Sequence, residues 1–365
     1  MRETFVYTSL PVRALFDVAA ADGVAAEADR LKWTRVLLIM APGERAAAAS
    51  GSILAALGGR VSAVFADARE HVPVEVLAAC IEAHGAVAAD GIVAIGGGSA
   101  IGLGKLVAAR TKTALIAVPT TYSGAELTPF NTVTENGVKT QHRDVAMLPM
   151  AIVYDPELTL SLPLAVTGPS MMNALAHAIE ALYAPETNAI VALKSEMSIG
   201  LAARALPKVV ARLDDRDARR DLLLSAMLCG ELLAVTSVGL HHKLCHILGG
   251  AFGLPHAGVN AVILPYAVAY NAPGAREAMA RVAAALGIAS GGKGSGGVAG
   301  AIFDLAQASG APASLAALGL PDGAIETVAR TAAGQTYANP VPLDVERLRV
   351  MLAAAYRGDR PPAAW

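Results

Sequence analysis

The first 160 residues alternate short, wholly apolar runs with alanine-rich stretches, and this alternation restricts the possible folds more than any other feature. A strand that is apolar at every position is buried on both faces, as in a parallel sheet covered by helices. The alternation therefore predicts a doubly wound α/β domain, with helices at 74–84 and 100–109. The predicted strands are 36–40, 62–65, 91–95, 114–118 and 150–154, with 3–7 as a further edge strand.

The pattern changes after Pro156, where long Ala/Leu-rich periodic segments replace the strand signal. We therefore predict two domains, an α/β dinucleotide-binding domain at 1–160 and an all-helical catalytic domain at 161–365, which suits a chain of 365 residues. Within the second domain, 290–300 is predicted as a glycine-rich loop and 357–365 as a loosely held, proline-rich tail.

The composition excludes several classes of protein. A net charge of −2 gives no electrostatic case for binding nucleic acid or an anionic membrane. No apolar run reaches the roughly 18–20 residues that span a bilayer, and the N-terminus lacks a signal-peptide pattern. The three cysteines are widely spaced and form no CxxC pair, as in free thiols of a reducing compartment. We expect a cytoplasmic protein with a small-molecule partner.

A glycine-rich turn follows the predicted strand 91–95 directly. Gly96, Gly97, Gly98 and Ser99 open the next predicted helix. Glycines let a backbone approach a phosphate closely, and the free N–H groups and dipole of a helix start then hold the anion. A tight turn without a ligand is the alternative, since the residues match neither GxGxxG nor a Walker loop. The strand-turn-helix context favours a cofactor phosphate site.

Four hydroxyl side chains follow the predicted strand 114–118, namely Thr120, Thr121, Tyr122 and Ser123. Ligands of open α/β sheets bind beyond the carboxyl ends of the strands. These hydroxyls therefore suit a ribose, a phosphate or a nicotinamide amide. A helix-capping role for Thr120 or Ser123 is compatible with that function.

Histidines concentrate in the predicted helical domain, after residue 160. Five of the eight are His177, His241, His242, His246 and His256, and none follows. Asn173 and His177 are four residues apart in a predicted helix and share one face, as do His242 and His246. Clustering of this kind favours a functional site over isolated, half-buried imidazoles.

The neighbours of these histidines complete the predicted site. His241 and Lys243 are expected to point away from the face of His242 by about a third of a turn. His256 follows a Gly-Pro turn that returns it to the same site. Three imidazoles and an amide oxygen would accept a divalent metal, but a carboxylate in place of Asn173 would suit it better. Metal ligation and an acid–base or anion-binding role both remain open at this point.

The chain resembles the iron-containing alcohol dehydrogenase family in five motifs that occur in the family's order and spacing. They are GGGS at 96–99, PTT…GAELTPF at 119–130, YDPELTLSLP at 154–163, NALAHAIEALY at 173–183 and HHKLCHILGGAFGLPH at 241–256. The resemblance covers most of the chain. It implies a Rossmann-like α/β domain followed by an all-α domain, the fold shared with dehydroquinate synthase.

Within that family the sequence resembles the maleylacetate reductase group. The motifs are GGGSAIGLGK with Gly102, PTTYSGAE with Tyr122, HVPVEV at 71–76, KTQHRD at 139–144 and GLHHKLCH at 239–246. The resemblance implies reduction of the conjugated C=C bond of maleylacetate to 3-oxoadipate, a late step in aromatic and chloroaromatic degradation. The cofactor would be NADH or NADPH. Ala41-Pro42-Gly43 lacks the Asp that often selects NADH, so the preference stays open.

The metal ligands of the family correspond to Asn173, His177, His242 and His256, and the Asp of the family is here Asn173. Loss of that charge weakens a divalent-metal site and favours a dianionic substrate. We therefore predict activity without a metal, in which histidine and lysine side chains stabilise the enolate.

The resemblance also suggests individual roles. His246 would lie beside the nicotinamide, and His177, His242 and His256 would form an imidazole ring around the substrate. Lys243 and Arg143 are candidates for carboxylate binding, with ordinary surface charges as the alternative. The remaining assignments are Tyr122 as a catalytic or nicotinamide-packing group, Asn173 and His241 as substrate-binding residues, and Lys139 as a cofactor-binding residue.

Three alternatives remain. The first is a metal-dependent alcohol or aldehyde dehydrogenase in which Asn173 still binds the metal. The second is a lyase resembling 3-dehydroquinate synthase, which would need a metal and more basic residues. The third is a non-catalytic scaffold, which would have no use for the glycine turn or the histidine cluster. The resemblance further implies a homodimer, formed through the N-terminal edge strand.

Overall fold

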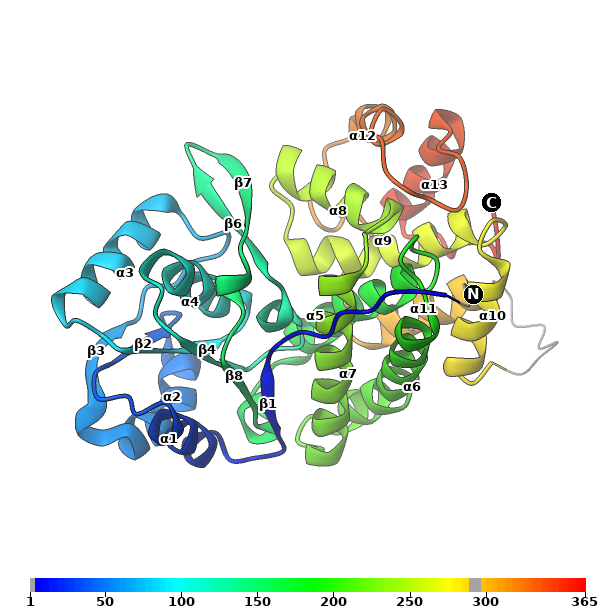
Figure 1. The fold of residues 1–365 in the computed structure, drawn as a ribbon. Coiled ribbons are helices and arrows are strands. Elements are labelled where there is room, and N and C mark those ends of the chain that lie inside the picture. Colours follow the sequence, from blue (N-terminus) through cyan, green and yellow to red (C-terminus); the bar gives the residue numbers. More distant parts are fainter. Residues whose placement is uncertain (1–3, 289–296) are drawn as a thin grey trace. The chain divides into compact units, whose positions relative to one another are not determined.

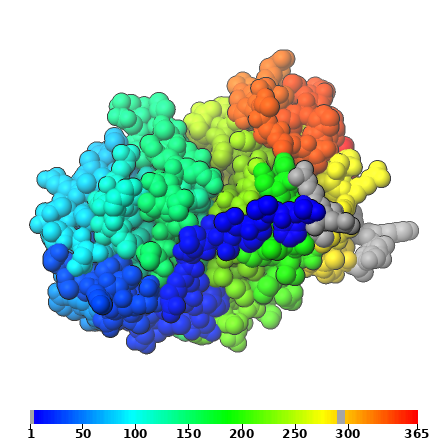
Figure 2. All heavy atoms as spheres, in the orientation of Figure 1, coloured from blue at the N-terminus to red at the C-terminus, as the bar shows by residue number. Residues whose placement is uncertain are grey.

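The computed structural model describes residues 4–288 and 297–365 and divides the chain into two compact units (Figure 1). The α/β unit comprises Ser9–Leu162, and the helical unit comprises Pro163–Trp365 together with the residues before Ser9. The division falls close to the predicted residue 160, but the N-terminal segment groups with the helical unit. The Lys194 ammonium donates to the Tyr7 hydroxyl at 2.9 Å, which holds this segment on a helix. Figure 2 shows the segment extended across the surface.

The α/β unit contains a six-stranded parallel sheet in the order β1-β8-β5-β4-β2-β3. The strands are β1 Arg13–Phe16, β2 Val36–Met40, β3 Val61–Phe65, β4 Gly91–Gly96, β5 Leu115–Pro119 and β8 Ala151–Tyr154. All five predicted strands occur, but β3 lies at the edge of the sheet and its residues are partly exposed rather than buried on both faces. The edge strand predicted at 3–7 is wrong: residues 4–7 form no strand, residue 3 lies outside the described residues, and β1 pairs with β8 instead.

Helices between the strands account for the apolar character of the sheet. They are α1 Ala20–Arg30, α2 Glu44–Leu57, α3 Val74–Ala86 and α4 Gly98–Thr111. Side chains of α1 and α2, Val24 and Ile53 among them, bury Val36, Leu38 and Val93 in one core. A strand covered on both faces has no position for a polar side chain, which explains the uninterrupted apolar runs.

A two-stranded antiparallel hairpin, β6 Phe130–Glu135 and β7 Val138–Arg143, was not predicted. Asn136 and Gly137 connect its strands, and both adopt positive φ values, 48° and 76°. Asn-Gly is the preferred pair for such a tight turn, so the sequence did contain the signal. The polar composition of the two strands concealed it.

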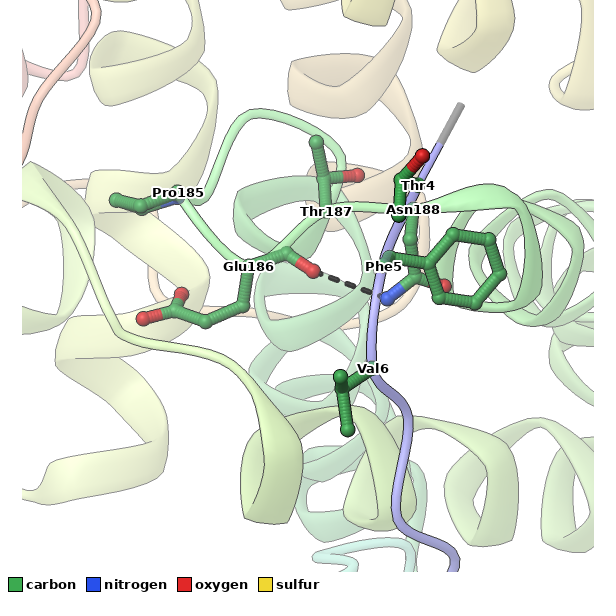
Figure 3. A pocket seen from close by; sticks show the side chains of 7 residues that line it. All are labelled: Thr4, Phe5, Val6, Pro185, Glu186, Thr187 and Asn188. Carbon is green, nitrogen blue, oxygen red and sulfur yellow. Dashed lines mark hydrogen bonds between the residues drawn. The ribbon is translucent and has the colours of Figure 1, made fainter. Parts of the chain in front are cut away.

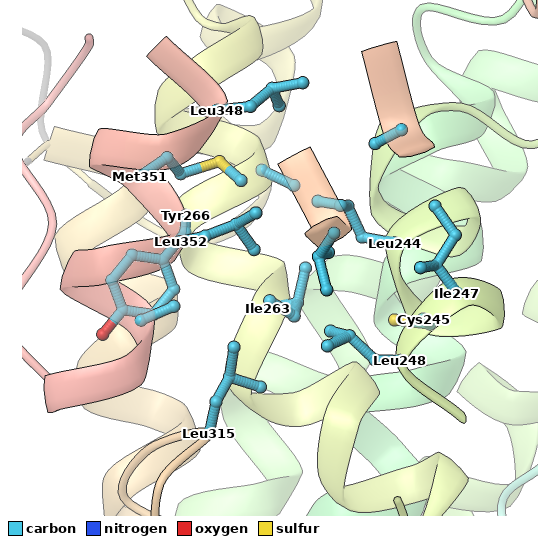
Figure 4. Close-up of a cluster of buried hydrophobic side chains, with 14 of the residues drawn as sticks. Leu244, Cys245, Ile247, Leu248, Ile263, Tyr266, Leu315, Leu348, Met351 and Leu352 are labelled. Carbon is cyan, nitrogen blue, oxygen red and sulfur yellow. The ribbon is translucent and has the colours of Figure 1, made fainter. Parts of the chain in front are cut away.

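The helical unit confirms the all-helical prediction, since no strand occurs among its described residues. Its helices are α5 Leu164–Ala181, α6 Ala189–Ala211, α7 Arg216–Val235, α8 Leu240–Ala251, α9 His256–Asn271, α10 Arg276–Ala285, α11 Gly297–Ala308, α12 Ala324–Ala333 and α13 Val345–Arg357. One apolar core joins α8, α9, α12 and α13, with Leu248, Ile263 and Met351 among its side chains (Figure 4).

Two sequence predictions for this unit need correction. The predicted glycine-rich loop lies mostly in 289–296, outside the described residues, but its end is helical because α11 begins at Gly297. The tail is not loosely held. The Trp365 ring stacks on Tyr266 with centroids 6.1 Å apart, and its carbonyl oxygen accepts a hydrogen bond from Arg347 at 2.8 Å. An aromatic residue at the end of a polar tail provides the anchor.

No single helix among the described residues is both long and apolar enough to cross a membrane. Helices α7 and α8 meet the length and composition requirement only as a pair, and the chain bends by 92° between them.

Candidate functional site

The glycine turn of the α/β unit has the geometry of an anion cradle. Strand β4 ends at Gly96, whose φ of +145° favours glycine, and α4 begins two residues later. No side chain caps α4, so its first N–H groups can bind an anion. A Cβ on Gly98 would meet no described atom within 4 Å, whereas one on Gly97 would lie 3.0 Å from Thr121 Cγ2. The open side at Gly98 fits the close approach of a dinucleotide phosphate.

The hydroxyl residues after β5 divide into two groups. The Thr120 amide donates to the Gly96 carbonyl at 2.9 Å and so joins the ends of two neighbouring strands. Thr121 and Ser123 are partly exposed, whereas Thr120 and Tyr122 are buried, Tyr122 completely. Their cofactor and substrate roles stay predictions. The burial of Tyr122 favours a packing role within its own unit.

Two buried charged residues beside this segment received no role from the sequence. Lys105 of α4 donates from Nζ to the Ala125 carbonyl, the Thr128 hydroxyl and the Phe130 carbonyl, each at 2.7 Å. Burial lowers the pKa of Lys105 to about 7. Glu126 accepts from the Tyr154 hydroxyl at 2.9 Å, and burial raises the pKa of Glu126. The segment after β5 is thus tied to α4 and to β8.

Lys139 and Arg143 both lie on β7 and are exposed. The Arg143 guanidinium carbon lies 5.6 Å from the centroid of the Phe130 ring, a cation–π distance. Neither residue belongs to the glycine turn. Cofactor binding by Lys139 and carboxylate binding by Arg143 stay predictions.

The helical unit brings the predicted histidines together in two pairs. Asn173 and His177 lie on α5, and His242 and His246 lie on α8. The rings of His177 and His242 stack with centroids 4.3 Å apart and planes 17° from parallel. His246 is exposed and pairs with His256, the first residue of α9, with ring centroids 6.5 Å apart.

His241 leaves α8 about 100° from His242, as consecutive helical residues do, yet its ring still contacts the His242 ring. Its ring meets that of His242 edge-on, with centroids 4.6 Å apart, and it is fully buried. Its Nε2 lies 3.0 Å from the Asn260 carbonyl oxygen of α9. The turn of about 100° per residue directs it between α8 and α9 rather than outward. Lys243 is half-buried, with Nζ 5.8 Å from the centroid of the Tyr337 ring.

Glu180 is the functional candidate that sequence reasoning missed. It is buried on α5, three residues after His177. Its carboxylate accepts the amides of Gly239 at 3.0 Å and His241 at 2.9 Å, and one oxygen lies 2.5 Å from His242 Nδ1. A glutamate on the buried face of an alanine-rich helix was the available signal, since burial of an unpaired carboxylate is costly.

Burial determines the protonation of this cluster. It raises the pKa of Glu180, and the hydrogen bonds from Gly239 and His241 oppose that rise. Burial and the neighbouring imidazoles lower the pKa values of His177 and His242 well below their usual range. Burial also lowers the pKa of His241 to about 3. The three imidazoles are therefore neutral at neutral pH.

Three of the buried polar atoms without a hydrogen-bond partner among the described residues belong to the predicted site: Asn173 Oδ1, His177 Nδ1 and His242 Nε2. Their chemistry would suit a cation, but their arrangement does not fit one. A metal ion lies in the plane of each imidazole that binds it, and the rings of His177 and His242 are stacked. Asn173 also supplies a neutral amide where a carboxylate would bind a divalent metal more strongly.

A different group has ligand atoms within 4.8 Å of one another, namely Glu180, His241 and His242. Within residues 4–288 and 297–365 it is the one such group of three or more. Its facing atoms already bond to each other and to backbone amides, so a metal would have to displace these hydrogen bonds.

A cavity of about 340 Å³ lies elsewhere in the helical unit, between the N-terminal segment and the loop before α6 (Figure 3). Phe5, Val6 and Asn188 are among its lining residues. Its one carboxylate, Glu186, accepts hydrogen bonds from Ser237. No predicted site residue lines this cavity.

Comparison with known proteins agrees with the division into two units. Residues 11–156 match the iron-containing alcohol dehydrogenase family, and residues 167–356 match the C-terminal part of that family. The chain is 44% identical over 357 residues to a maleylacetate reductase of Burkholderia cepacia, covering 98% of this chain and 99% of the relative. It is 42% identical over 359 residues to a maleylacetate reductase of Rhizobium sp. strain MTP-10005, with the same coverage.

Solved structures give the same result. The crystal structure of maleylacetate reductase from Agrobacterium tumefaciens superposes with a TM-score of 0.91 at 40% identity, covering 99% of this chain and all of that one. Two family matches that together span most of the chain, and relatives of this identity over nearly the full length, establish the relationship. The chain belongs to the iron-containing alcohol dehydrogenase family.

Proposed function

We propose that this protein reduces maleylacetate (4-oxohex-2-enedioate) to 3-oxoadipate with NADH or NADPH as the hydride donor. The observation that carries the proposal is the 44% identity, over nearly the whole of both chains, to an enzyme named for that reaction. The reaction belongs to the degradation of aromatic and chloroaromatic compounds through 3-oxoadipate.

The chemistry determines what the residues must do. The product keeps its ketone, so the conjugated C=C bond is reduced. When bound, the nicotinamide cofactor supplies a hydride to the alkene carbon β to the ketone, and charge develops on the ketone oxygen as an enolate. A proton then adds to the adjacent carbon. The protein must hold a dianion, stabilise the enolate oxygen and deliver one proton.

The described side chains suit these tasks. The open turn at Gly96–Ser99 and the uncapped start of α4 support the binding of the cofactor phosphates. The imidazoles of the helical unit are neutral, and Lys243 supplies a positive charge beside them for an anionic substrate. Asn173 contributes to this by being uncharged.

The proposal includes activity without a metal ion. The stacked rings of His177 and His242 and the neutral amide of Asn173 support it. The test is the rate of NADH oxidation by maleylacetate before and after treatment with a strong chelator. An unchanged rate is expected. Loss of the rate, restored by Fe²⁺ or Zn²⁺, would instead favour a metal-dependent alcohol or aldehyde dehydrogenase, which an assay with alcohols and aldehydes would identify.

We further propose that the protein is a homodimer. Large apolar side chains are exposed on the helical unit, namely Val6 at 93%, Leu193 at 68% and Met197 at 50%. Leu193 and Met197 are four residues apart on α6 and share a face. Sedimentation analysis of the wild type and of the double variant Leu193→Asp/Met197→Asp tests this, with a monomer expected for the variant. A wild-type monomer would contradict it.

A cytoplasmic location completes the proposal. Its support is chemical: Cys80, Cys229 and Cys245 are all unpaired and buried. Unpaired thiols are typical of proteins in a reducing compartment.

A further inference from the structure

The two ring nitrogens of His242 have different surroundings. Its Nδ1 lies 2.5 Å from a Glu180 carboxylate oxygen and 3.3 Å from His241 Nδ1. Its Nε2 is buried and has no hydrogen-bond partner among the described residues. A neutral imidazole carries one proton, so the nitrogen that holds it decides whether His242 presents a donor or an acceptor to a ligand.

The environment of His241 determines the position of that proton. A backbone carbonyl can only accept a hydrogen bond, so the His241 Nε2 that lies 3.0 Å from the Asn260 carbonyl must carry a proton. The neutral His241 ring then has a lone pair at Nδ1. This lone pair faces His242 Nδ1, so it favours the His242 proton on Nδ1, because two facing lone pairs would repel.

Glu180 leads to the same conclusion independently. Its two oxygens already accept hydrogen bonds from the amides of Gly239 and His241. A carboxylate surrounded by donors also accepts a hydrogen bond from the ring. The His242 N–H therefore points at Glu180. These two amides lie at the N-terminus of α8. Glu180, on α5, therefore also positions the helix that carries His242.

We propose that Glu180 is a positioning residue that, with the help of His241, locks His242 as the Nδ1–H tautomer and leaves the buried Nε2 as an acceptor. The catalytic consequence rests on the proposed function. A locked His242 cannot donate to the enolate oxygen, so that role passes to other donors such as Lys243. His242 instead accepts a hydrogen bond and orients a proton-bearing group.

The tautomer is measured directly by two-bond ¹⁵N–¹H correlation spectra of the full-length protein labelled with ¹⁵N-histidine, at neutral pH. His242 is assigned by the loss of its signals in His242→Gln. The wild type is expected to show a protonated Nδ1 and an unprotonated Nε2. A wild-type spectrum with the proton on Nε2 would overturn the proposal without any Glu180 variant.

Variants then assign the lock to Glu180. Glu180→Gln retains an acceptor oxygen and is expected to keep the tautomer, whereas Glu180→Leu is expected to give a mixture or the Nε2–H form. Glu180→Leu should also lower kcat about 10–100-fold with little change in the KM for maleylacetate, and Glu180→Gln should recover most of the loss. An unchanged tautomer in a folded Glu180→Leu protein would overturn the proposal.

Two matched variants complete the design. Glu186→Leu removes a carboxylate that accepts hydrogen bonds from Ser237, a residue that lies just before α8. This variant should leave the His242 tautomer unchanged. If Glu180→Leu does not fold, His241→Gln is used instead. In that variant Glu180 alone should hold His242 in the Nδ1–H form. A switch to the Nε2–H form would contradict the role of Glu180. Because these spectra need no turnover, a protein that shows the lock but does not reduce maleylacetate would refute the proposed function alone.

Discussion

The imidazole rings of His177 and His242 stack with centroids 4.3 Å apart and planes 17° from parallel. Two rings in this arrangement do not direct their lone pairs at one point, and Asn173 replaces the one carboxylate of the four-residue metal set that the family resemblance implies. The cluster therefore differs from a divalent-metal site both in the geometry of its rings and in the type of one residue.

Replacing Asn173 with Asp tests this separation. The added charge is expected to raise the affinity for Zn²⁺ at least about tenfold, because a carboxylate attracts a divalent ion where an amide does not. Titration calorimetry of the wild type, Asn173→Asp and Asn173→Leu measures the effect. Maleylacetate reduction should slow in Asn173→Asp, since the new charge repels a dianion. Equal Zn²⁺ affinity in all three proteins would contradict the prediction.

Replacing Gly98 with Ala tests the phosphate cradle. The new methyl group meets no described atom within 4 Å, so folding should be unaffected, but it would occupy the space that a cofactor phosphate needs. We expect the Kd for NADH, measured by fluorescence quenching, to rise about tenfold or more, equivalent to about 1.4 kcal/mol. Gly51→Ala on α2 is the control, because its methyl group is also unobstructed but lies away from the turn. An unchanged Kd for Gly98→Ala would place the phosphates elsewhere.

Replacing Lys105 with Met should destabilise the α/β unit. The variant leaves the Ala125 carbonyl, the Thr128 hydroxyl and the Phe130 carbonyl without the ammonium donor. We expect a loss of about 2–3 kcal/mol in the free energy of unfolding, measured with denaturant. Lys112→Met, which removes one exposed ion pair to Asp144, should cost less than about 1 kcal/mol. Similar losses in both variants would show that the buried bonds contribute little.

The Lys105 contribution should depend on pH. Burial lowers its pKa from 10.5 to about 7 in the folded protein. Between these values the unfolded chain binds the proton and the folded protein does not, so rising pH favours the folded state. The wild type should gain stability relative to Lys105→Met by up to about 1.4 kcal/mol per pH unit above neutrality. Unfolding curves of both proteins at several pH values test this; a constant difference would show that the pKa is not lowered.

The three thiols should be unreactive in the folded protein. Burial raises the pKa values of Cys80 and Cys229 to about 12 and that of Cys245 well above its usual value. At mildly alkaline pH almost no thiolate is present, and the thiolate is the nucleophile. A colorimetric disulfide reagent should therefore label none in the native state and all three in guanidinium. Rapid labelling of the native protein would indicate that one of these sites opens locally.

Local patterns in the sequence were sufficient for the architecture. Continuous apolar runs identified β2, β4, β5 and β8 because a strand buried on both faces excludes polar side chains at every position. The change to helical periodicity located the second unit, because the buried positions of a helix recur at a spacing that the sequence shows directly. The glycine turn was evident because its residues are consecutive and lie directly between a strand and a helix.

The tertiary structure decided the relationships that join distant parts of the chain. Glu180 and His242 are 62 residues apart, and only the packing of α5 against α8 brings the carboxylate to Nδ1. The edge position of β1 and the anchoring of Trp365 likewise depend on partners far along the chain. The sequence by itself determined which residue types could form the site. Helix packing determined which nitrogen of His242 faces Glu180, because the neighbours of a ring nitrogen depend on the packing of α5 and α8 and not on the order of residues.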